Sequence, residues 1–122
     1  TMREKQGGTI INSAGKKGSK DCWGQTADWV DYHGSVEGTT VGVAIFDHPS
    51  NFKKSRYHVR DYGLFTLSPF GDKAYTSGKL PAANFTLKTG QKLKLTYGLY
   101  VHDGTTEEGG VAQAYRQFVK GK

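Results

Sequence analysis

Residues 47–61 bring together two histidines, two arginines, two aspartates and an asparagine. Imidazole and carboxylate groups transfer protons near neutral pH, and a guanidinium binds hydroxyl or carboxylate oxygens through two parallel hydrogen bonds. This composition predicts a site that handles a polar ligand such as a carbohydrate or polyol. The candidates for catalysis are Asp47, His48, His58 and Arg60.

A sugar ring also needs a flat apolar surface and further hydrogen-bonding groups. The candidates for substrate binding are Asn51, Tyr62, Phe70 and Trp29. The general base is harder to assign, because the glutamates lie in turns or near the chain ends. It would be Asp47, Asp61 or a residue outside this chain.

The same residues also have structural interpretations. Asp-His-Pro favours a turn in which the aspartate accepts backbone hydrogen bonds, so His48 and Asn51 could simply shape that turn. Strand alternation places His58 and Arg60 on one face. The other two histidines, His33 and His102, are interpreted as surface or hydrogen-bonded strand residues.

Two further functions stay open from these residues. Asp47, His48 and His58 offer a nitrogen and oxygen ligand set for a metal, although their spacing matches no short ligand signature. The single Cys22 excludes a cysteine-based zinc cluster. The abundant aromatic residues would equally suit a non-catalytic interaction module. The residues do not identify a cofactor.

Hydrophobic patterning predicts the elements that position these residues. Val41–Phe46 is an unbroken apolar run of strand length, and the alternation in Asp28–Val36 predicts a half-buried strand paired with it as a hairpin. Further strands are predicted at Thr9–Asn12, Tyr57–Val59, Leu64–Leu67, Phe85–Lys88 and 93–102. Residues 13–21 and Ser68–Ala83 are predicted to be loops.

The chain ends in a different pattern. Thr105 and Glu108 have the spacing of a capping box, and the apolar residues from Val111 to Val119 follow a helical period. Glycine is abundant, at 17 residues, and the apolar set is mostly β-branched or aromatic. The predicted fold is therefore all-β, an antiparallel β-sandwich with a short C-terminal helix.

Chain length, net charge and hydropathy indicate the domain organisation and the classes of partner. The 122 residues predict one domain, 1–122, whose start without a secretion signal is typical of the C-terminal portion of a longer protein. The net charge of +6 is spread over several turns, which favours solvated loops over nucleic-acid binding. No apolar run is long enough for a membrane span. The oligomeric state is not predicted.

Four motifs resemble one family in order along the chain. They are WGQTADWVDYHG (Trp23 to Gly34), VGVAIFDHPSN (Val41 to Asn51), HVRDYGLF (His58 to Phe65) followed by PFG, and LTYGLYVHDG (Leu95 to Gly104). They resemble the C-terminal part of a soluble bacterial family labelled methane oxygenase PmoA. Members usually have Pro and Trp before HVR, where this chain has Ser55 to Tyr57.

The resemblance implies a large antiparallel β-sandwich similar to galactose-mutarotase-like folds, with a further N-terminal β portion. Together with the polar cluster it suggests a carbohydrate ligand and an extracytoplasmic location. The family label implies the alternative of a metal-binding oxygenase. The membrane methane monooxygenase subunit, however, consists of transmembrane helices, which this sequence does not encode.

Overall fold

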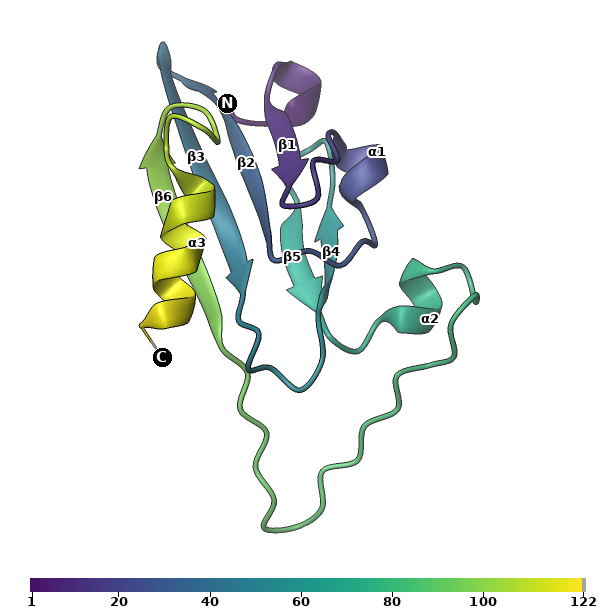
Figure 1. Ribbon diagram of the computed structural model, residues 1–122. Helices are drawn as coiled ribbons and strands as arrows, with labels where there is room; N and C mark the ends of the chain where they lie inside the picture. The colour runs from purple at the N-terminus through teal and green to yellow at the C-terminus, as the bar shows by residue number, and fades with distance from the viewer. Residues whose placement is uncertain (122) are drawn as a thin grey trace.

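The computed structural model describes residues 1–121 as three stacked layers: a helix, a four-stranded sheet and a two-stranded sheet (Figure 1). The strands are β1 (Thr9–Asn12), β2 (Trp29–Val36), β3 (Thr39–Asp47), β4 (Arg56–Val59), β5 (Phe65–Ser68) and β6 (Tyr97–Asp103). The helices are η1 (Glu4–Gln6), α1 (Ser19–Cys22), α2 (Asp72–Tyr75) and α3 (Val111–Lys120). The predicted all-β fold with antiparallel sheets and a short C-terminal helix is confirmed.

The larger sheet has the strand order β1-β2-β3-β6, with every neighbouring pair antiparallel. The predicted hairpin joins β2 to β3 through Glu37 and Gly38, whose φ angles are 51° and 80°. Two consecutive positive φ angles are characteristic of the type I′ turn, which matches the twist of the strands that it connects. β4 and β5 form the smaller sheet.

The two faces of the larger sheet are buried by different elements. On one face Ile10, Val30 and Tyr32 pack against Tyr57 and Val59 of β4, which are fully buried. On the other face Ala44 and Phe46 pack against α3, chiefly through Val111, Tyr115 and Phe118. The helix therefore covers the opposite face of the larger sheet from β4 and β5.

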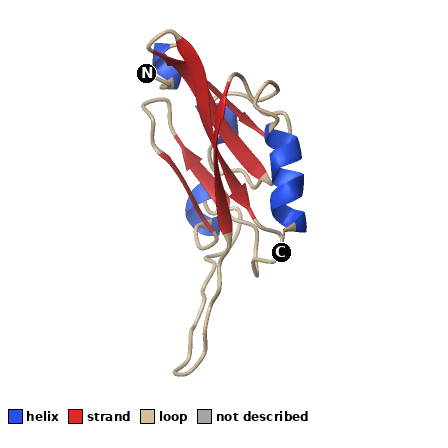
Figure 2. Cartoon of the chain, turned by 90° about the vertical axis from the view of Figure 1, so that its left-hand side faces the viewer, coloured by secondary structure: helices blue, strands red, loops and turns tan. Residues whose placement is uncertain are grey.

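The alternating segment 93–102 forms a strand only from Tyr97 onward, so the predicted start at residue 93 was wrong. Tyr97 pairs with Asp47, the last residue of β3, and the residues before Tyr97 have no strand to pair with. Phe85–Lys88 also forms no strand. Residues 81–96 instead form an arm that extends away from the sheets (Figure 2).

Two segments that were predicted to be loops each contain one short helix, α1 and α2. Such single turns carry no apolar period that could be read from the sequence. Among the helices of residues 1–121, none combines the length and apolar character that crossing a bilayer requires.

Candidate functional site

The turn after β3 is held together by its own polar side chains. Asp47 is 4% exposed and accepts hydrogen bonds from the Ser55 backbone N–H (2.7 Å) and the Asn51 Nδ2 (2.8 Å). Asn51 also donates to the Thr96 carbonyl (2.9 Å) and accepts from the Thr96 N–H (2.7 Å). Asp47 and Asn51 thus fasten the turn to the chain entering β6.

His48 lies in the same turn and is 6% exposed. Its Nδ1 accepts a hydrogen bond from the Ser50 backbone N–H (3.0 Å), so the ring hydrogen of a neutral imidazole lies on Nε2. Nε2 is buried without a hydrogen-bond partner in residues 1–121, and the ring packs edge-on against Phe118 of α3 at 5.2 Å. This histidine faces the protein interior.

His58 and Arg60 share one face, as the alternation predicted, and both contact Trp23. The rings of His58 and Trp23 lie 5.8 Å apart, and the Arg60 guanidinium lies 4.9 Å from the centre of the Trp23 ring. His58 Nδ1 is also 3.1 Å from the Tyr75 hydroxyl. In residues 1–121 no hydrogen bond, ion pair or ring contact joins this pair to the turn of residues 47–51.

The predicted substrate-binding aromatics are also separate from one another. Tyr62 is half-exposed beside the N-terminal residues, in a pocket of about 370 Å³. Phe70 forms an exposed cluster with Phe52 and Phe85 at the base of the arm. Trp29 is half-buried and lines a groove beside α3. The residues expected to build one site are thus distributed over several surfaces.

A different polar cluster is buried between the larger sheet and the loop before α3. Asp31 of β2 is fully buried and accepts hydrogen bonds from His102 Nε2 (2.7 Å) and the Thr106 hydroxyl (2.6 Å). His33 Nδ1 lies 3.2 Å from the same carboxylate and 3.2 Å from the Thr106 oxygen. We call Asp31, His33, His102 and Thr106 the Asp31 cluster.

The hydrogen bonds fix the orientation of the His33 ring. The carboxylate is an acceptor, and the Thr106 hydrogen points to Asp31, so both neighbours of His33 Nδ1 require a donor. In the neutral ring the hydrogen therefore lies on Nδ1, and Nε2 carries a lone pair. Nε2 has no partner in residues 1–121 and is not buried.

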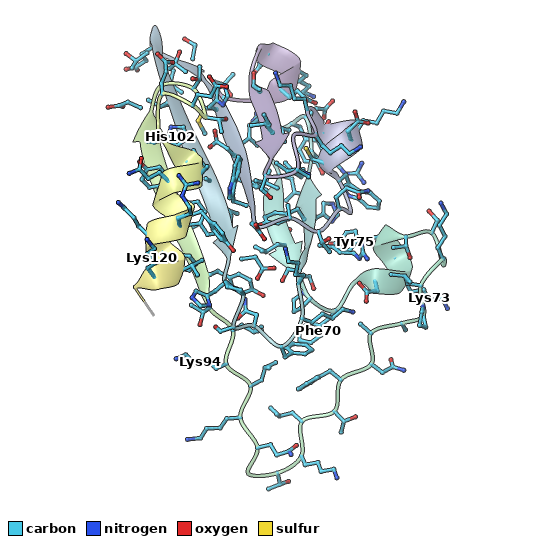
Figure 3. All side chains as sticks on the ribbon, viewed as in Figure 1. Phe70, Lys73, Tyr75, Lys94, His102 and Lys120 are labelled. Atoms are coloured by element: carbon cyan, nitrogen blue, oxygen red, sulfur yellow. The ribbon has the colours of Figure 1, made fainter. Side chains whose placement is uncertain are left out.

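Two glycines make room for the His102 ring, which Figure 3 labels near the end of β6. A Cβ at Gly42 would lie 2.6 Å from the ring, and one at Gly109 would lie 2.2 Å from it. Because Gly42 pairs with both His33 and His102 in the sheet, its missing side chain lets His102 reach across β3 to Asp31. Any larger residue at these glycines would displace the imidazole.

The loop over the cluster has its own internal support. The Thr105 N–H donates to Glu108 Oε1 (3.0 Å), and the Glu108 N–H donates to the Thr105 hydroxyl (3.3 Å). This confirms the predicted capping box, although it closes a turn ahead of α3 rather than the first turn of that helix. Hydrogen bonding to Thr105 lowers the pKa of Glu108. The box orders the loop that carries Thr106 to Asp31.

A groove runs along this face between β1 and the start of α3. One part has a volume of about 300 Å³ and is lined by His33, Lys17 and Glu107. The adjoining part has a volume of about 450 Å³ and is lined by Trp29, Arg116 and, again, Glu107. Ile11, Thr106 and Glu107 line both parts, so the two parts lie side by side. It combines an imidazole, a carboxylate, two cations and an aromatic surface.

Part of this cluster was indicated by the sequence. Asp31 and His33 lie two residues apart in the strand predicted over Asp28–Val36, so alternation places them on one face. His33 and His102 were interpreted as surface or hydrogen-bonded strand residues. The structure supports the second of these interpretations, because both rings are bonded to Asp31. Only the pairing of β3 with β6 brings His102 to the same place.

Residues 1–121 contain no group of three or more His, Cys, Asp or Glu side chains arranged to hold a metal ion. The chain is thus a small antiparallel β domain in which a histidine–aspartate pair lies beside a groove large enough for a small ligand. The chain belongs to a family of unknown function, DUF6807, whose model matches residues 1–116. No curated protein and no solved structure matches the chain.

Proposed function

We propose that the groove beside the Asp31 cluster binds a carbohydrate or polyol and that His33 contacts a ligand hydroxyl. The observation that carries this proposal is the orientation of His33, whose Nδ1 faces the Asp31 carboxylate while Nε2 is unpartnered beside the groove. A buried carboxylate that fixes an imidazole tautomer is a recurring arrangement at sites of proton transfer.

The groove has the size and composition that such a ligand needs. Its two parts, of about 300 and 450 Å³, lie in the range typical of small-molecule sites. Trp29 offers an aromatic face for the apolar side of a sugar ring. Glu107 accepts hydroxyl hydrogens, whereas Lys17 and Arg116 donate to ligand oxygens.

The same geometry would support acid–base chemistry on a bound sugar. His33 Nε2 would accept a proton from a ligand hydroxyl, and Asp31 would stabilise the resulting imidazolium. Glu107 is the second titratable group on the groove and could exchange a proton with the opposite side of the ligand. Whether the protein only binds or also transforms its ligand is decided by the kinetics of the His33 variant.

The test is a titration of the chain with a panel of neutral and acidic mono- and disaccharides, followed by NMR. We expect one class to shift the Trp29 indole and His33 ring signals together. His33→Gln should weaken binding roughly tenfold, because an amide replaces an oriented imidazole. If the protein is an enzyme, this variant should lose far more in rate than in affinity.

The matched control is His58→Gln, because His58 is a half-buried histidine outside the groove. We expect this variant to bind as the unchanged protein does. Loss of sugar binding in His58→Gln but not in His33→Gln would move the site to His58 and Arg60 and overturn the groove proposal. A panel in which no sugar shifts the groove signals would overturn the ligand class.

A further inference from the structure

The last strand of the larger sheet has an open edge. β6 pairs with β3 on one side and with no strand of residues 1–121 on the other. It lies at the margin of the sheet in Figure 1, and the loop after it turns inward over the sheet, where Thr106 contacts Asp31. The outer backbone groups of β6 are therefore free to pair with another strand.

The side chains on this edge are apolar and uncovered. Leu99 and Val101 are 74% and 73% exposed, more than any other large hydrophobic residue in the chain. They lie on the same face of the sheet as β4 and β5 but beyond the part that these strands cover, whereas α3 covers the opposite face. Edge strands are usually protected by lysine or proline, but β6 carries neither.

The edge is complementary to itself. In an antiparallel pair of two β6 strands centred on Tyr100, Leu99 of each copy lies directly opposite Val101 of the other. Two apolar cross-strand pairs then form on the open face, and each stabilises the pairing. A second copy of this chain thus supplies a hydrogen-bonding partner for the free backbone edge of β6 and apolar contacts for Leu99 and Val101.

The charges at the two ends of the strand fit the same arrangement. Lys94 lies shortly before the start of β6, and Asp103 is the last residue of the strand. An antiparallel pair places the basic end of one copy beside the acidic end of the other. Parallel pairing would bring like charges together, so charge also selects the antiparallel arrangement.

From these features we propose that two copies of the chain associate through β6 to form one continuous eight-stranded sheet. The proposal does not depend on the sugar-binding groove, which lies on the other face near β1. The closed symmetry of such a pair satisfies both free edges at once and leaves no further β6 edge for growth.

Sedimentation equilibrium of the chain over a wide range of concentration tests the proposal. We expect a reversible monomer–dimer equilibrium. Leu99→Lys should weaken it roughly tenfold or more, because a charge would be buried against Val101 of the second copy. Leu87→Lys is the matched control, since Leu87 is 50% exposed on the arm, away from β6, and its replacement should leave the equilibrium unchanged.

Disulfide trapping tests the register. Directly opposite residues bring their Cβ atoms to about 4.5–5.5 Å, whereas diagonal neighbours are roughly 7–8 Å apart. The double variant Leu99→Cys with Val101→Cys should therefore form covalent dimers on oxidation, and either single variant should not. Cys22 is buried and does not compete.

Circular dichroism verifies that each variant is folded. A chain that stays monomeric at every concentration would overturn the proposal. So would a dimer that Leu99→Lys leaves intact. Efficient trapping of either single cysteine variant would overturn the register centred on Tyr100.

Discussion

The turn at Asp47 and the cluster at Asp31 are both built around a buried aspartate, and they differ in what the aspartate holds. Asp47 accepts hydrogen bonds from an amide side chain and a backbone N–H of its own loop. Asp31 accepts them from an imidazole and a hydroxyl carried by segments more than 70 residues away in the sequence. The first aspartate shapes a loop, and the second gathers titratable side chains.

This difference shows why a density of polar residues in the sequence is an ambiguous indication of function. Residues 47–51 are polar because a turn must satisfy its own backbone and side-chain groups. The Asp31 cluster draws on three separate segments, and its His33 Nε2 is left without a partner beside a groove. A partly unsatisfied group at a surface groove is the better indication of a ligand.

The largest effect is expected when the centre of the cluster is removed. Asp31→Ala leaves His102 and Thr106 without their buried acceptor, and we expect a loss of about 3–5 kcal/mol in the free energy of unfolding. Urea denaturation measures it. Asp21→Ala, at an exposed position on α1, should change it by less than about 0.5 kcal/mol. Equal effects of the two variants would remove the special status of Asp31.

The turn should respond differently. Asn51→Ala removes the amide that bonds both Thr96 backbone groups and Asp47, and we expect it to cost about 2–4 kcal/mol because these groups lose their partners. Sugar affinity at the groove should not change, as titration of the folded variant would show. Asn84→Ala in the exposed arm is the control for both measurements. A parallel loss of affinity would assign the turn a functional role.

The smallest expected effect is a loosening of the loop before α3 at acidic pH. The pKa of Glu108 is lowered from its ordinary value of 4.5 by hydrogen bonding to Thr105, so its ionised form favours the folded loop. This contribution is complete above pH 4.5 and is lost as the pH falls through the lower pKa of the folded state. The protection factors of the amides in residues 104–110, which correct for the pH dependence of intrinsic hydrogen exchange, should therefore fall on acidification.

Glu108→Gln is the control for that measurement. The amide keeps an acceptor for the Thr105 N–H but does not titrate, so the acid-dependent change in the protection factors should disappear. If the loop of the variant still loosens over the same pH range, another group governs the loop, and the capping box does not couple to the Asp31 cluster.

Local patterns predicted most of the fold correctly. The β2–β3 hairpin, the strands β1, β4 and β5 and the helix α3 follow from apolar periodicity and turn residues, which act over a few neighbouring positions. The strand predicted over residues 93–96 was wrong because the prediction used only this local pattern. Its alternation is that of a strand, but a strand also needs a partner, and β3 ends at Asp47. Pairing is a property of the fold, not of the segment.

The sequence by itself determined the residue types, the antiparallel β class and the placement of His58 and Arg60 on one face, because side-chain alternation is a local property of extended backbone. Only the tertiary structure decided which polar residues meet. His102 lies 71 residues from Asp31 and reaches it because β6 joins β3 and Gly42 has no side chain. Such contacts depend on strand order and on the space left by glycine. Neither can be predicted from the sequence immediately around the two residues in contact.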